Sequence, residues 1–337
     1  MELTQEQMEY LSEHPEADDL VPMIRMSDVE LKDVSFLWRP YIPFGKLTIL
    51  HGDPGQGKTY LAMQLCAACT NRVLLPNMEE QKPFNVIFQT AEDGLGDTIK
   101  PRLIEAGADL DRVLVIREEP GNMLTLSDDR IEKAIIQNKA KMFIVDPVQA
   151  FIGDRIDMNR ANEVRPIFRH LADVAERTDC AIIPIGHLNK KEGSQSTYRG
   201  LGSIDITASA RSVLLVGCTK NDPDLRVVVH DKSSLAPAGS SLGFILGDDE
   251  GFRWIGEYDI TANELLTGTK GQKKTDQAIE LIRQILSGGR EMLNEDLDKA
   301  ALSRNISTRT LREAKKELGD ELKSRITEGR KKVFWME

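Results

Sequence analysis

Hydrophobic residues between positions 46 and 255 form short apolar runs, and longer amphipathic stretches separate several of these runs. Short apolar runs bounded by turn residues are typical of buried strands, whereas apolar residues three or four positions apart are typical of helices. The expected strands cover residues 47–51, 85–89, 112–116, 142–145, 181–185, 212–216 and 225–230, and the expected helices cover 58–70, 99–105, 127–138 and 161–177. This alternation predicts an α/β fold with a mostly parallel sheet.

A different pattern begins after a polar stretch that contains glycine and lysine. Amphipathic helices are expected at residues 276–286, 294–302 and 308–318, followed by two strands within 322–335 that turn at Glu328 and Gly329. Ser307 or Thr308 would cap the third helix, and Gly319 would end it. This order is typical of a helix-turn-helix with a wing, so the sequence predicts a small winged-helix-like domain.

Charge divides the chain at the same place. The net charge is −10 overall, but residues 270–337 contain 16 Lys and Arg against 12 Asp and Glu, which leaves 28 against 42 for residues 1–269. The C-terminal part therefore carries +4 and the rest −14. We expect a helical lead at residues 1–35, an α/β domain at 36–266, a linker at 267–275 and the winged-helix-like domain at 276–337.

One glycine-rich string carries the strongest chemical signal. Residues 52–59 read Gly-Asp-Pro-Gly-Gln-Gly-Lys-Thr and lie between an expected strand and an expected helix, which is the context of a nucleotide-binding P-loop. Its backbone N–H groups would surround phosphate oxygens, Lys58 would reach the β and γ phosphates of ATP, and Thr59 would bind Mg²⁺. The expected nucleotide-binding residues are Gly52, Asp53, Pro54, Gly55, Gln56, Gly57, Lys58, Thr59 and Tyr60.

Two acidic positions follow expected strands and would face the nucleotide. Asp146 ends the apolar run 141–146 and is expected to bind Mg²⁺ opposite Thr59. Because Pro147 rather than a second acid follows it, the general base is expected at Glu92, just past the strand after the P-loop helix. Asp93 is the rival, although it suits the role of N-cap for the next helix better than Glu92 does.

The P-loop, Glu92, Asp146 and the later string Ile-Pro-Ile-Gly-His-Leu-Asn-Lys at 183–190 together resemble the RecA-like ATPases. More narrowly, residues 36–250 are similar to the RepA-type hexameric replicative helicases of plasmids and phages. The resemblance implies that residues 36–266 form a RecA-like ATPase domain that uses ATP and Mg²⁺. It also implies a homo-oligomer, expected to be a hexameric ring.

The same resemblance gives roles to three later residues. His187 matches the histidine that senses the γ-phosphate, with a buried structural histidine as the alternative. Arg211 matches the finger that reaches a neighbouring subunit's ATP, and a surface ion pair is its alternative. Lys232 matches a further basic position before a Pro/Gly loop. Related DnaB-like helicases carry Lys-x-Arg there, whereas this chain has Lys232 and then Ser234, so Arg199 is a further candidate finger.

Nucleic-acid contacts are expected in two places. Residues 149–163 and 189–203 read as loops near the nucleotide, and in RecA-like rings such loops face a channel that holds single-stranded nucleic acid. The expected contacts are Lys190, Lys191, Tyr198 and Arg199 in the second loop, and Arg309, Arg312, Lys315 and Lys316 in the C-terminal domain. The alternatives are a solvated loop in the first case and a protein-docking winged helix in the second.

Composition indicates the cellular compartment of the protein and the state of its cysteines. No run of 18 apolar residues exists and the first residues are acidic, so we expect a cytoplasmic protein without a membrane partner. Cys66 and Cys69 form a C-x-x-C pair inside an apolar helix and are expected to be buried core thiols.

Together these features predict a ring-forming Mg-ATPase that acts on single- or double-stranded DNA, most plausibly a RepA-like replicative helicase or translocase of a phage or mobile element, working with replication or recombination proteins. The alternative is an ATP-switched DNA loader or recombination mediator that does not translocate.

Overall fold

The computed structural model describes residues 23–119, 121–153, 156–158, 160–187, 204–219, 222–247, 251–267, 274–302, 304, 306–327 and 332–336. Contacts between Cα atoms divide the chain into two units, Met1–Ser35 and Phe36–Glu337. Within the first unit, the described part contains one 3-10 turn at Met26–Asp28. None of the described helices is long and apolar enough to cross a membrane.

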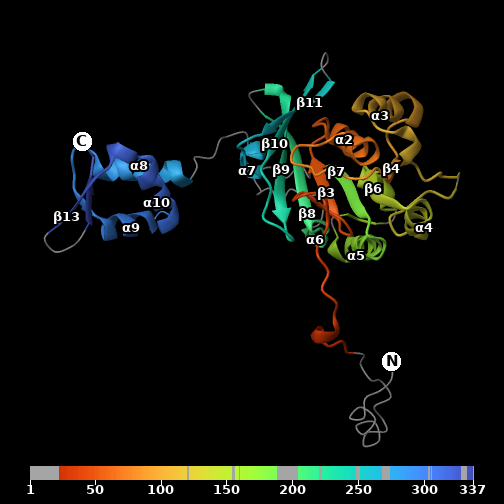
Figure 1. The fold of residues 1–337 in the computed structure, drawn as a ribbon, viewed down its shortest axis with the longest axis horizontal. Coiled ribbons are helices and arrows are strands. Elements are labelled where there is room, and N and C mark those ends of the chain that lie inside the picture. Colours follow the sequence, from red (N-terminus) through yellow and green to blue (C-terminus); the bar gives the residue numbers. More distant parts are fainter. Residues whose placement is uncertain are drawn as a thin grey trace, which may run out of the picture. The chain divides into compact units, whose positions relative to one another are not determined.

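The second unit is built on a large sheet (Figure 1). In the described residues, nine strands lie in the order β11-β10-β9-β8-β3-β7-β6-β4-β5. Their bounds are β3 (Thr48–Gly52), β4 (Asn85–Thr90), β5 (Val113–Leu114), β6 (Ala140–Asp146), β7 (Ala181–His187), β8 (Ser212–Thr219), β9 (Asp222–Ser233), β10 (Leu242–Gly247) and β11 (Gly251–Glu257). The strands from β8 to β5 in this order run parallel, and β9, β10 and β11 extend the sheet in antiparallel fashion. The predicted α/β fold with a mostly parallel sheet is confirmed.

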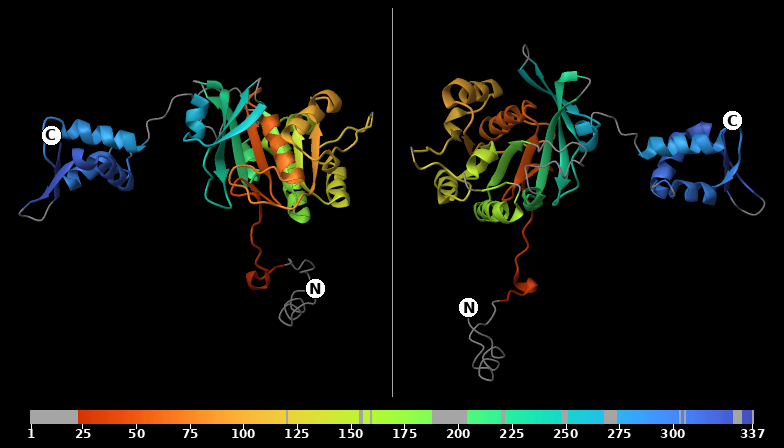
Figure 2. Two further views of the ribbon diagram at one scale, coloured as in Figure 1. Left: turned by 45° about the horizontal axis from the view of Figure 1, so that its top comes forward. Right: turned by 180° about the vertical axis from the view of Figure 1, so that it is seen from behind.

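Helices cover both faces of the parallel part (Figures 1 and 2). The helices of this part are α2 (Lys58–Asn71), α3 (Lys100–Ala106), α4 (Asp129–Asn138), α5 (Ala161–Thr178), α6 (Ile204–Ser209) and α7 (Ala262–Thr267), with shorter turns at Leu95–Ile99, Leu110–Arg112 and Val148–Phe151. Apolar residues of α2 and α3 pack with Leu50 and Phe88, whereas those of α4 and α5 pack with Ile49 and Ile87. Successive side chains of one strand therefore point to opposite faces of the sheet and pack into two separate cores. A short strand pair, β1 (Phe36–Trp38) and β2 (Ile42–Pro43), adds Trp38 to the α2 side.

One predicted strand is shorter than its apolar run. The run 112–116 forms β5 over only Val113–Leu114. The side chain of Gln89 replaces the next backbone partner, because its amide accepts a hydrogen bond from the Ile116 N–H (3.0 Å) and donates to the Ile116 carbonyl (3.3 Å). The same amide donates to Glu118 at 3.0 Å.

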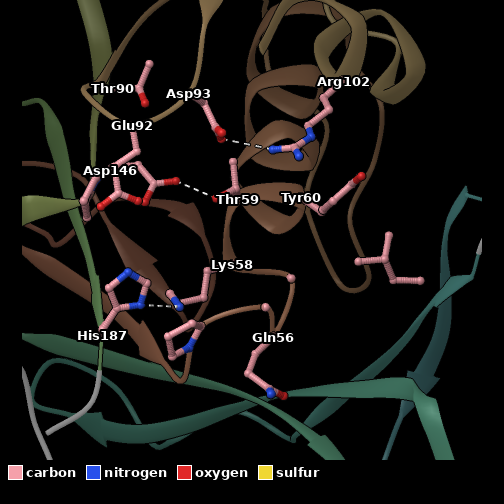
Figure 3. Close-up of a pocket in the computed structure, with 15 residues that line it drawn as sticks. Gln56, Lys58, Thr59, Tyr60, Thr90, Glu92, Asp93, Arg102, Asp146 and His187 are labelled. Carbon is pink, nitrogen blue, oxygen red and sulfur yellow. Dashed lines mark hydrogen bonds and ion pairs between the residues drawn. The ribbon is translucent and has the colours of Figure 1, made fainter. Parts of the chain in front are cut away.

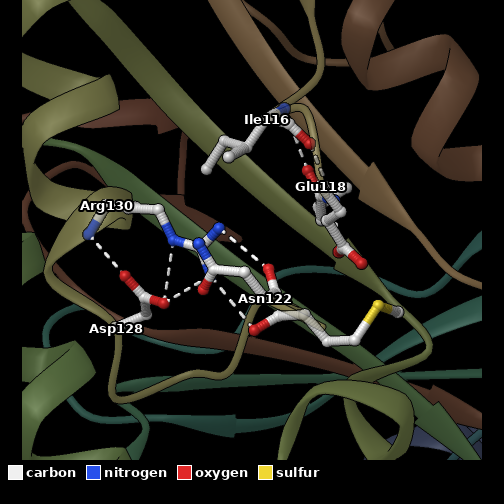
Figure 4. A network of polar contacts seen from close by, with 7 residues as sticks. Ile116, Glu118, Asn122, Asp128 and Arg130 are labelled. Atoms are coloured by element: carbon white, nitrogen blue, oxygen red, sulfur yellow. Dashed lines mark hydrogen bonds and ion pairs between the residues drawn. The ribbon is translucent and has the colours of Figure 1, made fainter. Parts of the chain in front are cut away.

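In the described residues between β5 and α4 there is neither helix nor strand, and Arg130 bonds to several of them. Its guanidinium donates to the carbonyls of Asn122 (3.1 Å) and Met123 (3.0 Å) and to the Asp128 carboxylate (Figure 4). Asp128 also caps α4 by accepting from the Arg130 backbone N–H at 2.8 Å. Hydrogen bonding to Arg130 lowers the pKa of Asp128.

Strands β10 and β11 were not predicted. Glycines at 243, 247, 251 and 256 interrupt their apolar positions, so neither the strand alternation nor a continuous run is visible in the sequence. In the structure Phe244 stacks on Phe252 with ring centroids 4.6 Å apart, and Trp254 meets both rings edge-on. These aromatic contacts between neighbouring strands supply the stabilisation that the glycines lack.

The C-terminal part has a core of its own. Its elements are α8 (Lys274–Leu286), β12 (Met292–Leu293), α9 (Asn294–Leu302), α10 (Thr308–Glu317), a 3-10 turn at Gly319–Glu321, β13 (Lys323–Ile326) and β14 (Lys332–Trp335). The sheet order is β12-β14-β13, and all pairs are antiparallel. Ser307 caps α10, as predicted, by accepting from the Thr310 N–H at 3.1 Å. The predicted turn at Glu328 and Gly329 lies outside the described residues.

Cys66 and Cys69 have the buried environment that the sequence predicted, whereas Cys218 is only partly buried. Cys66 and Cys69 are buried on α2, and Cys180 is buried beside β7. Burial raises the pKa of the Cys66 thiol above its usual range. A protonated thiol in an apolar core is a poor nucleophile and a poor metal ligand, so these residues serve packing.

Candidate nucleotide-binding site

The carboxyl ends of β3, β4, β6 and β7 border one cavity of about 330 Å³ (Figure 3). Its walls are Pro54, Gly55, Gln56, Gly57, Lys58, Thr59, Tyr60, Thr90, Glu92, Asp93, Arg102, Asp146, Pro147, His187 and Leu246. Most of the predicted P-loop residues, both acids and His187 are thus brought together by one edge of the sheet. Parallel strands place their carboxyl ends at the same edge, which explains why residues 129 positions apart, Lys58 and His187, meet here.

The P-loop backbone needs its glycines at three positions. Gly55 and Gly57 have positive φ angles of 75° and 87°, and Gly57 precedes the first residue of α2. A Cβ atom on Gly52 would lie 2.1 Å from the carbonyl oxygen of Val216 on β8. The loop can therefore turn sharply against the sheet and direct the N-terminus of α2 into the cavity, a favourable arrangement for anions.

Lys58 is held by its own loop. Its ammonium donates to the carbonyl oxygens of Gly52 and Asp53, both at 2.9 Å, and lies 3.2 Å from Nδ1 of His187 (Figure 3). Burial lowers the pKa of Lys58, and the charges of Asp146, Asp53 and Glu92 oppose that shift. The ammonium is positioned between the loop and the strand that ends at His187, where a phosphate oxygen could join it.

Thr59 and Asp146 form the second pair in the cavity. The Thr59 hydroxyl donates to Oδ2 of Asp146 at 2.7 Å. Burial raises the pKa of Asp146, while the Thr59 hydrogen bond and the Lys58 charge work in the opposite direction. A hydroxyl and a carboxylate side by side are hard oxygen donors that suit Mg²⁺, which takes few protein ligands and keeps water and phosphate for the rest. The described residues contain no group of three or more His, Cys, Asp or Glu side chains that could hold a metal ion.

The two neighbouring acids have different surroundings. Asp93 forms an ion pair with Arg102, with 3.1 Å between its Oδ2 and Nη1 (Figure 3). Glu92 also lines the cavity and follows Thr90, whose strand position pairs with Asp146. The expectation that Asp93 caps the next helix is wrong, because Gly94 occupies the N-cap position and no side chain caps it.

Sequence reasoning missed Arg102 and Leu246 as wall residues. Arg102 lies on α3 with its guanidinium carbon 4.9 Å from the centre of the Tyr60 ring, so a cation and an aromatic ring flank one side of the cavity. Leu246 comes from β10, which the sequence did not reveal.

Arg211 and Lys232 lie at the opposite end of the strands. The Arg211 N–H donates to the carbonyl of Leu47, just before β3 begins, whereas the cavity adjoins the other end of β3 at Gly52. Five residues of strand separate these ends, which corresponds to about 16 Å. The Lys232 ammonium donates to the carbonyls of Thr207 (2.9 Å), Ala208 (3.3 Å) and Ala210 (2.8 Å) at the end of α6. Neither residue borders the cavity of its own chain.

The predicted nucleic-acid contacts divide into three groups. Lys190, Lys191, Tyr198 and Arg199 lie outside the described residues, as does the side chain of Arg309 on α10. Arg312 and Lys316 are exposed on α10. Lys315 is mostly buried, with 14% of its side chain exposed, and its ammonium contacts Asn294 and Asp298 of the C-terminal part.

The sequence of this chain matches a known family and two characterised proteins. The model of a family described as an AAA domain matches residues 12–193, more than half of this chain. The DNA repair protein RadA of Halalkalibacterium halodurans is 26% identical over 166 residues, which cover 49% of this chain and 32% of RadA. Protein RecA of Sulfurimonas denitrificans is 25% identical over 212 residues, which cover 60% of this chain and 54% of RecA.

Among solved structures, the ATPase domain of G40P matches with a TM-score of 0.49 and 12% identity, covering 63% of this chain and 85% of that domain. The chain spans about a third of RadA and about half of RecA.

Proposed function

The chain belongs to the AAA domain family, and from this premise we propose that it is a Mg²⁺-dependent ATPase that assembles into a ring and acts on DNA. The observation that carries the proposal is the single cavity in which a P-loop, a hydroxyl–carboxylate pair and a further acid meet. Together these groups suit the binding and hydrolysis of a nucleoside triphosphate with Mg²⁺ at an anion-binding helix end.

Each residue of the cavity has a defined part in this proposal. Lys58 would contact the β and γ phosphates of ATP, and Thr59 with Asp146 would hold Mg²⁺, which would supply positive charge to balance that of the phosphates. Glu92 orients the attacking water and accepts its proton, because it borders the cavity and Asp93 is engaged by Arg102. His187 lies beside Lys58 through Nδ1 and could respond to the γ phosphate through its other ring nitrogen.

The ring rests on the position of the basic residues. Lys58 and Arg102 line the cavity, but Arg211 and Lys232 do not. The arginine finger that the resemblance to RepA-type helicases implies would therefore come from a neighbouring subunit. Because Arg211 is exposed at the opposite end of β3, it can reach an ATP only in a neighbouring subunit. Closed symmetric rings arise when such a head-to-tail contact repeats through a closing rotation.

DNA as the partner rests on the relatives and on the resemblance. RadA is named for DNA repair, and RecA is the second curated relative. Together with the similarity to RepA-type helicases, this favours a replicative helicase or translocase. The names RadA and RecA also favour a second candidate, an ATP-switched loader or recombination mediator that binds DNA without moving along it.

Two measurements test the proposal. ATP hydrolysis is followed with and without single-stranded DNA, and displacement of a labelled strand from a partial duplex is followed under the same conditions. We expect DNA-stimulated hydrolysis together with strand displacement, and hydrolysis stimulated by DNA without displacement would select the mediator. Lys58→Ala serves as the control and should abolish hydrolysis, because it removes the P-loop cation. Full turnover by Lys58→Ala would overturn the ATPase assignment.

A further inference from the structure

A concavity in the C-terminal part concentrates positive charge. It measures about 480 Å³ and lies among α9, α10 and the strands β13 and β14. Four of its lining residues are cations, namely Arg312, Lys315, Lys316 and Lys332, and the one carboxylate that lines it is Asp298. The ratio of four to one far exceeds the 16 to 12 of residues 270–337 as a whole. This surface is therefore suited to a polyanion.

Lys315 shapes the concavity from within. Its ammonium donates to Oδ1 of Asn294 at 2.7 Å, lies 3.4 Å from Oδ1 of Asp298, and is 4.8 Å from the centre of the Phe334 ring. Lys332 approaches the same ring at 5.0 Å. These contacts join α10 to α9 and to β14, so the three exposed cations are held on a rigid frame. Burial lowers the pKa of Lys315, and Asp298 opposes that shift.

The exposed cations are arranged along one helix and one strand. Arg312 and Lys316 are four residues apart and so lie on the same face of α10, which is ten residues long. Lys332 begins β14 and borders the same concavity. A helix that presents cations, with a basic strand beside it, matches the dimensions of the DNA major groove and the phosphate backbone next to it.

We propose that this concavity, defined by Arg312, Lys316 and Lys332, is a binding site for the sugar-phosphate backbone and major groove of double-stranded DNA. It is separate from the nucleotide cavity and does not require ATP hydrolysis. Duplex is favoured over single-stranded DNA because the ring that lines the concavity, Phe334, is only 6% exposed. Single-strand sites depend on exposed rings that stack with bases.

The charge on a second surface of the C-terminal part determines how a bound duplex would be oriented. A depression between α8 and the end of α10 is lined by Asp276, Glu280, Glu317 and Glu321, with Arg283 as its cation. Phosphates would be repelled from that surface and attracted to the concavity. A duplex would therefore bind in one orientation, with α10 toward the groove.

The experiment uses the full chain without nucleotide, so that it reports binding independently of hydrolysis. Fluorescence anisotropy is measured with a labelled random-sequence duplex and with its single strand, over a range of salt concentrations. The test variant combines Arg312→Gln, Lys316→Gln and Lys332→Gln. The matched control combines Arg283→Gln, Lys299→Gln and Arg325→Gln, three exposed cations of the same module that pair with Glu321, Asp296 and Glu291. Both variants change the net charge equally, and thermal unfolding confirms that each is folded.

We expect the test variant to lose about tenfold or more in duplex affinity at low salt. Its slope of log affinity against log salt should fall by about 2 to 3, since each phosphate contact contributes about 0.9. The control variant should keep the wild-type slope. Equal losses in both variants, unchanged duplex binding in the test variant, or a loss confined to the single strand would each overturn the proposal. Duplex binding that persists while ATP hydrolysis is absent would contradict the proposed function instead and leave this site intact.

Discussion

At the level of single residues, the two acids beside the cavity have different surroundings, from which we proposed different roles for them. Asp93 is engaged by Arg102 at 3.1 Å, whereas Glu92 borders the cavity near Asp146. We expect Glu92→Gln to retain ATP binding but to lose hydrolysis by about 10² or more, which is the usual effect of removing a general base. Binding of a fluorescent ATP analogue and steady-state phosphate release measure the two properties.

Asp93→Asn is the matched comparison for Glu92→Gln. It weakens the ion pair with Arg102 without removing a residue that we expect to contact water, so it should reduce hydrolysis less than Glu92→Gln does. If Asp93→Asn proved the more damaging change, the base would be Asp93.

A second prediction at this scale concerns pH. Burial lowers the pKa of His230 to about 4, and burial with the Lys58 charge lowers that of His51 to about 4. Nδ1 of His230 accepts from the Gly239 N–H at 3.0 Å, and Nε2 lies 3.0 Å from the Ser212 hydroxyl, whose own hydrogen is donated to the Tyr41 carbonyl. The neutral ring with its hydrogen on Nε2 satisfies all these contacts, and protonation of Nδ1 would break the bond to Gly239.

A histidine whose pKa is lowered by folding stabilises the folded state above the unfolded value near 6.5 and loses that stabilisation as pH falls toward 4. At about pH 5, each histidine should therefore contribute a loss of about 2 kcal/mol in the free energy of unfolding relative to about pH 7.5. Urea unfolding followed by the fluorescence of the buried Trp38 measures this loss. His230→Asn should show about 2 kcal/mol less pH dependence than wild type, and an identical pH dependence would show that His230 does not contribute.

At the level of elements, the sequence predicted the parts whose signal is local. Strands β3, β4, β6 and β7 are buried apolar runs, and α2 follows a P-loop, so both kinds of element were visible from neighbouring residues alone. The end of β5 was not, since it depends on Gln89, a side chain 27 positions away that replaces a backbone partner. Strands β10 and β11 depend on aromatic contacts between strands, which glycine-rich sequence conceals. Leu246 was missed as a cavity residue for the same reason.

The role of Gln89 gives a prediction at this scale. Gln89 is only 2% exposed, and its amide serves both the N–H and the carbonyl of Ile116. Gln89→Leu should lower the free energy of unfolding by about 1 to 3 kcal/mol, which is the cost of leaving a buried polar group without a partner. Glu118→Gln, which keeps an oxygen acceptor for the Gln89 amide, should have a much smaller effect. Urea unfolding compares the two variants, and equal stability of Gln89→Leu and wild type would rule out this role.

At the scale of the whole molecule, the position of the basic residues relative to the cavity bears on the proposed ring. Arg211 and Lys232 share the edge of the sheet opposite to the P-loop, so neither can complete its own site. Lys232 is already bonded to three carbonyls of its own chain, and burial lowers its pKa. Arg211 is exposed. Of the two, Arg211 is therefore the better candidate for a contact with a neighbour's ATP.

A mixing experiment tests this arrangement. Arg211→Ala alone should be nearly inactive, because an arginine that acts on a transferring phosphoryl group contributes about 10³–10⁵ in rate. Lys58→Ala should be inactive for a different reason, since its own P-loop lacks the cation. In a mixed ring, however, a Lys58→Ala subunit still carries Arg211 and can donate it to the intact P-loop of an Arg211→Ala neighbour. We therefore expect the mixture to regain hydrolysis that neither variant shows alone.

The same mixture made with Lys232→Ala in place of Arg211→Ala is the control, and native mass measurement with and without ATP shows whether the variants assemble together. If Lys232 only holds the end of α6, the Lys232→Ala protein should lose thermal stability, and mixing should not restore the loss. If co-assembled Arg211→Ala and Lys58→Ala remain inactive while the Lys232→Ala mixture recovers, then Lys232 supplies the trans contact. If neither mixture recovers, Arg199 becomes the remaining candidate among the basic residues that the sequence singled out.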